Sequence, residues 1–134
     1  GEELLFYKAY SNQDKTDLIG YALIDSAQAY SSDKIRTVFG VDTSLKHLTR
    51  IRILYQKETP GLGDRCREVL SGDTYPWFQK QFFGKNANSL AVDKDGGDIQ
   101  SITAATITSR AIADGIAGKV EWLRDYLQKN QSSQ

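Results

Sequence analysis

The stretch Glu58-Thr59-Pro60-Gly61-Leu62-Gly63 separates two parts of the chain that have different sequence patterns. Proline lacks a backbone N–H and glycines follow it, so this stretch cannot continue a strand and is predicted to be a loop. Before the loop, apolar and polar residues alternate as in half-buried strands, and after it they recur at helical spacing. Strands followed by helices favour an α+β fold, with an antiparallel sheet followed by short helices and a long C-terminal helix packed on it.

The part before the loop contains four predicted strands. Polar turns at 11–15 and 43–46 separate the members of each successive pair, which favours hairpin connections and an antiparallel sheet. The strands are predicted over residues 3–10, 17–30, 35–42 and 48–55.

The part after the loop is predicted to be mainly helical. Short helices at 62–70 and 75–83 precede a short strand at 90–92. One apolar stripe then marks the clearest element, a helix from about Thr106 to Gln128. The members of the stripe are Ile112, Ile116, Val120, Leu123 and Leu127. We expect residues 1–129 to form a single domain and residues 130–134 to form a polar tail.

The formal net charge of the 134 residues is zero, because 17 basic residues balance 17 acidic ones. Nucleic-acid binders usually carry a basic excess, so no nucleic-acid partner is expected. No apolar run reaches the roughly 18 residues that a membrane-spanning helix needs. Cys66 is the only cysteine, so this chain alone forms no disulfide and no cysteine-based metal cluster.

Cys66 and His47 are the candidates for a nucleophile and an imidazole base. His47 lies in an alternating run on the same side as Thr49 and Ile51, which favours an ordinary strand histidine over a catalytic or metal-binding one. Arginines on both sides of Cys66 could lower the pKa of its thiol. Free cysteines are usually buried, so the favoured interpretation is a small residue on the inner face of a short helix.

The start of the predicted long helix is the first candidate for a binding site. Residues 101–109 carry several hydroxyls and small side chains, and the free N–H groups of a first helical turn attract anions such as phosphate. The alternative is ordinary helix capping by Thr103.

The loop at 58–63 is the second candidate, because a glycine-rich backbone between a strand and a helix can admit a planar ligand. The alternative is a simple turn. An aromatic group could flank such a ligand, although its spacing is more typical of a buried helix face. Its members are Trp77, Phe78, Phe82 and Phe83.

Residues 57–63, 77–85 and 103–109, in this order and spacing, resemble the FMN-binding domain family. That family includes the C subunit of the sodium-translocating NADH:quinone reductase and the G subunit of the Rnf electron-transport complex. The resemblance implies that FMN is bound covalently, through a phosphoester to the last threonine of a Ser/Thr-Gly-Ala-Thr motif, and that a separate flavin transferase installs it from FAD. Thr106 matches that threonine.

The resemblance also implies roles for the residues around Thr106. Thr108 and Ser109 are expected to donate hydrogen bonds to the phosphate, and Thr59 and Leu62 to lie against the isoalloxazine ring. The expected cofactor-binding residues are therefore Thr103, Ala104, Ala105, Thr106, Thr108, Ser109, Glu58, Thr59, Gly61, Leu62 and Gly63.

Two positions depart from the family motif. Ala104 stands where glycine is usual, and its extra methyl is expected at a close-packed site. Gln100 stands where an aspartate is usual, although Asp98 lies two residues earlier. Both departures are expected to affect the covalent attachment of FMN more than its binding.

The expected function is that of an electron carrier without its own catalytic acid, base or metal site. The expected partners are the other subunits of an ion-translocating redox complex and the flavin transferase. The resemblance places the domain on the outer (periplasmic or extracellular) face of the cytoplasmic membrane, held by an N-terminal anchor that the chain as given lacks. The alternatives are an FMN-binding module of a flavin-dependent reductase or membrane regulatory protein, and a flavin-free binding or scaffold domain.

Overall fold

The computed structural model describes residues 6–132 and has the predicted α+β fold. Four strands form one antiparallel sheet in the order β1-β2-β3-β4. The strands are β1 (Tyr7–Tyr10), β2 (Leu18–Ala27), β3 (Ile35–Asp42) and β4 (Leu48–Tyr55). The helices that follow are the 3-10 helix η1 (Gly63–Arg67), α1 (Trp77–Lys80), the 3-10 helices η2 (Ala87–Ser89) and η3 (Asp93–Asp95), and α2 (Thr106–Ser132).

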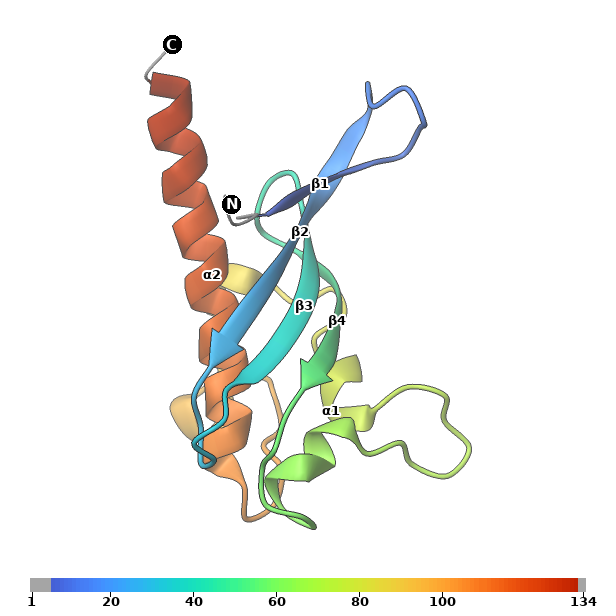
Figure 1. Ribbon diagram of the computed structural model, residues 1–134, viewed down its shortest axis with the longest axis vertical. Helices are drawn as coiled ribbons and strands as arrows, with labels where there is room; N and C mark the ends of the chain where they lie inside the picture. Colours follow the sequence, from blue (N-terminus) through green and yellow to red (C-terminus); the bar gives the residue numbers. More distant parts are fainter. Residues whose placement is uncertain (1–5, 133–134) are drawn as a thin grey trace.

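The long helix α2 lies along one face of the sheet, α1 packs against β4, and η2 packs against α2 (Figure 1). The predicted apolar stripe of α2 faces the core. Ile112, Ile116, Val120 and Leu123 are buried, and Leu127 packs against the core while partly buried. They meet core side chains of the strands, among them Leu23, Phe39 and Ile51. Burial of this stripe explains why a 27-residue helix is stable.

Several predicted boundaries differ from the observed ones. The strand at 17–30 ends at Ala27, and residues 3–5 of the first predicted strand lie outside the described residues. The strand at 90–92 is absent, because Val92 makes only a single bridge, to Ile99. The helix predicted to end at Gln128 continues to Ser132.

The two predicted short helices are also shorter than their sequence patterns. The helix at 62–70 shrinks to η1, and the helix at 75–83 shrinks to α1. Buried Gln79 explains this, because its amide accepts from the Ile53 N–H at 3.0 Å and donates to the Cys66 carbonyl at 2.9 Å. This tertiary contact fixes the segment after β4 against the sheet, so local helical propensity does not decide its conformation.

Cys66 is fully buried on η1, as predicted. His47 is not a half-buried strand residue, because it precedes β4 and its side chain is 60% exposed. Its Nδ1 lies 2.9 Å from Asp42 Oδ2, so the ring closes the turn between β3 and β4. Within residues 6–132, no helix is both long enough and apolar enough to cross a membrane.

Candidate functional site

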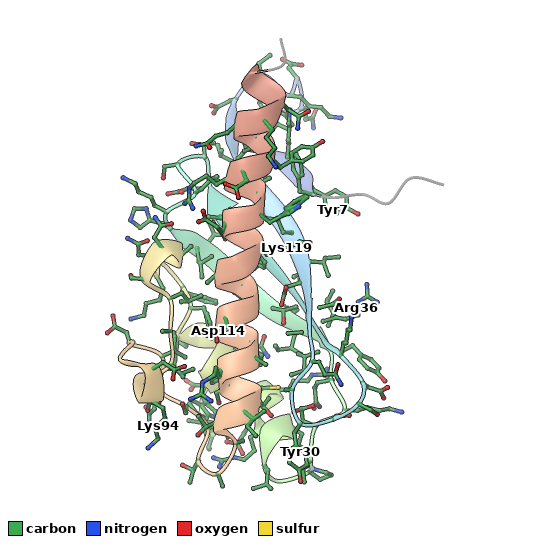
Figure 2. All side chains as sticks on the ribbon, turned by 90° about the vertical axis from the view of Figure 1, so that its left-hand side faces the viewer. Tyr7, Tyr30, Arg36, Lys94, Asp114 and Lys119 are labelled. Atoms are coloured by element: carbon green, nitrogen blue, oxygen red, sulfur yellow. The ribbon has the colours of Figure 1, made fainter. Side chains whose placement is uncertain are left out.

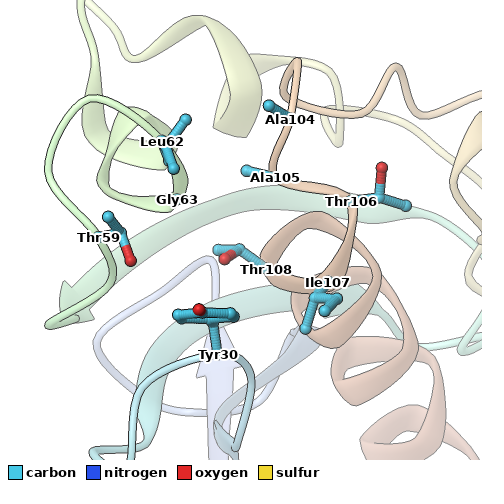
Figure 3. A pocket seen from close by; sticks show the side chains of 9 residues that line it. All are labelled: Tyr30, Thr59, Leu62, Gly63, Ala104, Ala105, Thr106, Ile107 and Thr108. Carbon is cyan, nitrogen blue, oxygen red and sulfur yellow. The ribbon is translucent and has the colours of Figure 1, made fainter.

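A cavity of about 450 Å³ lies where three segments meet (Figure 3). These segments are the loop between β2 and β3, the loop after β4, and the start of α2. The volume falls within the approximately 300–1,000 Å³ that is usual for small-molecule sites. The lining residues are Tyr30, Thr59, Leu62, Gly63, Ala104, Ala105, Thr106, Ile107 and Thr108. The structure therefore brings the two candidate segments together at one site.

Gly63 allows the loop after β4 to touch α2. A Cβ atom at this position would lie 2.4 Å from Thr108 Oγ1 and 2.8 Å from the Glu58 Cβ, both far inside van der Waals contact. Gly61 turns the same loop with φ of 77°, in the left-handed region that glycine enters without strain. Leu62, between the two glycines, is 40% exposed and stands at the cavity.

Glu58 does not line the cavity but holds its walls together. Its side chain is buried, and Oε1 accepts from the Tyr30 N–H at 3.1 Å and from Thr108 Oγ1 at 2.6 Å. Oε2 accepts from the Ser31 N–H at 3.0 Å. A buried carboxylate is costly unless it is paired, and three donors from two other segments satisfy this one.

A hydroxyl contact holds the turn before α2. Ser109 Oγ accepts from the Ile102 N–H at 2.9 Å and donates to the Ala105 carbonyl at 3.0 Å. Between these residues, Ala104 adopts a φ of 63°, which lets the chain turn into the helix. This contact closes the turn before the helix and is not the first-turn cap predicted for Thr103, which is exposed.

The structure divides the hydroxyls of this region into two groups. A hydroxyl has one proton. Thr108 donates its proton to Glu58 and Ser109 donates its proton to the Ala105 carbonyl, so neither is free to donate to a phosphate. Thr59 and Thr106 also lie at the cavity, and within residues 6–132 their hydroxyls have no hydrogen-bond partner.

Thr106 is the first residue of α2 and stands at the rim of the cavity. Figure 3 shows the methyl groups of Ala104 and Ala105 turned toward Leu62, with the Thr106 hydroxyl farther out on the helix side. The first backbone N–H groups of a helix lack intrahelical acceptors, and the helix dipole adds positive potential there. The rim at Thr106 is therefore suited to an anion.

Two lining residues, Tyr30 and Ile107, were missed by the sequence analysis. Ile107 is apolar but lies off the buried stripe of α2, and its 54% exposure shows that it does not serve the core. Its place outside the apolar stripe can be read from the sequence and could have indicated a residue that lines the site. Tyr30 lies in a polar loop, and nothing in its local sequence points to the cavity.

Two other candidate features belong to the core. Phe78 and Phe82 are fully buried and Trp77 packs against the core, so the aromatic group does not flank the cavity. Burial, followed by the charge of Glu58, raises the pKa of the Cys66 thiol to about 12. Burial and the raised pKa both favour the neutral thiol over the reactive thiolate.

Residues 31–120 match the family described as FMN-binding domain. The chain belongs to this family. The match spans the loop after β4 and the start of α2, two of the three segments that form the cavity. Tyr30, on the third segment, lies just before the matched residues.

Three relatives share one name, the G subunit of the ion-translocating oxidoreductase complex. The chain is 36% identical over 95 residues to the protein of Vibrio vulnificus, a match that spans 71% of this chain and 44% of the relative. It is 27% identical over 120 residues to that of Methanosarcina acetivorans and 32% identical over 121 residues to that of Pasteurella multocida. Each of these two matches covers 90% of this chain and 58% of the relative. The chain thus spans about half the length of these relatives.

The residues at the cavity fit FMN. Leu62, Ala105 and Ile107 offer apolar surface to a planar ring, and the start of α2 offers N–H groups to a phosphate. No lining residue carries a negative charge that would oppose the phosphate.

Proposed function

We propose that this chain is an electron-carrier domain that binds FMN covalently through a phosphoester to Thr106. One observation carries the proposal: Thr106 places a hydroxyl without an internal partner at the N-terminus of a long helix, on the rim of a flavin-sized cavity. A phosphodiester keeps a negative charge, which the helix N-terminus stabilises by about 0.3–1 kcal/mol.

The linking step is a phosphoryl transfer that needs FAD and a flavin transferase. Thr106 Oγ forms a new bond to the phosphorus on the FMN side of FAD, and the bond from that phosphorus to the bridging oxygen breaks. AMP leaves with the bridging oxygen, and the threonine proton passes to a base of the transferase. No electron is transferred in this step.

When bound, FMN supplies the electron-transfer chemistry, and the protein binds and orients it. The lining side chains include no carboxylate, imidazole or amine, so the site is built for holding a ring rather than for acid–base work. Glu58 and Gly63 keep the loop after β4 closed against α2.

The proposal extends to the assembly. The relatives are named as subunits of an ion-translocating oxidoreductase complex, which supports other subunits of a membrane redox complex as partners of this domain. The family resemblance supports a place on the outer face of the cytoplasmic membrane, with the domain held by an N-terminal anchor.

The test is the intact mass of protein produced together with a flavin transferase and then denatured. We expect the wild-type chain to gain one FMN less one water. Thr106→Val should lose this adduct completely. Thr59→Val is the matched control, because it removes the other threonine hydroxyl at the cavity that lacks an internal partner, and it should retain the adduct.

The other outcomes separate the alternatives. Yellow protein whose flavin is released on denaturation would support an FMN-binding module without covalent linkage. Protein that stays colourless beside a competent transferase would support a flavin-free scaffold domain. An adduct retained in Thr106→Val would contradict the proposed linkage.

A further inference from the structure

Tyr30 is the one aromatic residue among the described residues that line the cavity. It lies on the loop between β2 and β3, and the residue is 74% exposed. Figure 3 shows the ring at the foot of the cavity, nearly edge-on, with one face turned toward the space between Thr59 and Thr108. Leu62 stands across that space.

The backbone of this exposed residue is held by buried groups. The Tyr30 N–H and the Ser31 N–H donate to the two oxygens of Glu58, which is 4% exposed. Glu58 also holds Thr108 on α2. The loop that carries Tyr30 is therefore fixed to the other two segments of the site.

An ordinary solvated loop needs no such anchor. A buried carboxylate costs free energy that its hydrogen bonds must offset, and here two of its three donors come from the exposed loop. The arrangement positions one flat, exposed ring against a flavin-sized cavity. Within residues 6–132 that ring has no aromatic partner of its own.

We propose that Tyr30 forms one wall of the flavin site, with its ring stacked on one face of the isoalloxazine and Leu62 on the other face. This inference rests on the proposed function, because it names a residue of the same FMN site. Offset-stacked aromatic pairs contribute beyond the area that they bury, and Tyr supplies such a surface with few rotatable bonds. Glu58 is the positioning residue that holds this wall.

Stacking has an optical signature that a merely structural role lacks. A phenol ring in contact with a photoexcited flavin gives it one electron and then takes the electron back, so emission is lost without net chemistry. A stacked Tyr30 therefore quenches the fluorescence of FMN on Thr106.

The experiment measures emission per covalently bound flavin in the loaded protein, with the adduct verified by mass. Tyr30→Leu should raise this emission above wild type, and Tyr30→Trp should keep it low because indole also stacks and donates. Tyr7→Leu is the matched control. Tyr7 is 50% exposed and lies on β1, in the upper half of Figure 2 and away from Tyr30 at the bottom, so its loss should leave emission unchanged.

A second measurement uses affinity in place of emission. In Thr106→Val protein, where FMN can bind only reversibly, adding Tyr30→Leu should weaken FMN binding about 2- to 12-fold, the factor for one aromatic pair. Adding Tyr7→Leu should not change the dissociation constant. Because Tyr30 is exposed, these variants are expected to fold, which far-UV circular dichroism checks.

Failure of this inference is distinguishable from failure of the proposed function. If FMN is attached to Thr106 but Tyr30→Leu leaves emission at the wild-type value, the proposed stacking of Tyr30 on the flavin is wrong. The proposal that the domain carries FMN on Thr106 then stands. If the wild-type chain takes up no FMN at all, both are wrong.

Discussion

At the residue scale, the backbone angle of Ala104 shows where the chain is strained as it turns into α2. Its φ of 63° lies in the left-handed region, which costs a residue with a Cβ roughly 1–2 kcal/mol. We expected the family's glycine to reflect close packing, but Ala104 is exposed and its methyl is not crowded. In this chain the backbone turn into α2, and not close packing, therefore favours glycine at position 104.

The substitution Ala104→Gly tests this explanation. It should raise the free energy of unfolding by about 1 kcal/mol, because the relief of the left-handed strain exceeds the added freedom of the unfolded chain. Urea denaturation measures the change. Ala111→Gly, inside α2, is the matched control and should instead lower stability by about 0.5–1 kcal/mol. Equal losses in both variants would contradict a strained Ala104.

At the scale of the element, the start of α2 depends on a hydroxyl inside the helix. Ser109 is fully buried and satisfies both the Ile102 N–H and the Ala105 carbonyl. Ser109→Ala should lower the free energy of unfolding by about 1–3 kcal/mol, because it leaves a buried donor without an acceptor.

Thr103→Ala is the control for this prediction. Thr103 is exposed, so its substitution should change stability by less than about 0.5 kcal/mol. Both values come from urea denaturation of the flavin-free chain. A larger loss in Thr103→Ala than in Ser109→Ala would restore the interpretation that Thr103 caps the helix.

The elements that could be predicted from sequence are those with long, repeated patterns. β3 and β4 match their predicted ranges, and α2 begins at the predicted Thr106. The first and last residues of the short helices η1 and α1 could not be predicted, because Gln79 fixes that segment through tertiary contacts. Tyr30 could not be found, because its place at the cavity depends on Glu58, 28 residues away.

At the scale of the whole molecule, Cys66 is packed inside the hydrophobic core. The thiol is fully buried, and burial together with the charge of Glu58 raises its pKa to about 12. An unfolded thiol has a pKa of about 8.5. The fold thus favours the neutral thiol, and this contribution to stability is complete below about pH 8.5 and is lost as the pH rises toward 12.

Labelling of Cys66 by a disulfide reagent at pH 8 is therefore expected to be blocked in the folded protein. With increasing urea, the labelling rate should follow the fraction of unfolded chain measured by circular dichroism. Rapid labelling without urea, at the rate of a free thiol, would show that η1 opens independently of the core.

Fragmentation of one peptide tests most directly whether FMN is linked to Thr106. Trypsin releases residues 95–110 of the flavin-loaded chain, a peptide that contains the competing hydroxyls Ser101, Thr103, Thr108 and Ser109 as well as Thr106. The fragment masses should place the whole adduct on Thr106, the residue of this peptide that combines a place at the cavity with a hydroxyl free of internal bonds. An adduct on any other residue, or none in this peptide, would contradict the linkage to Thr106.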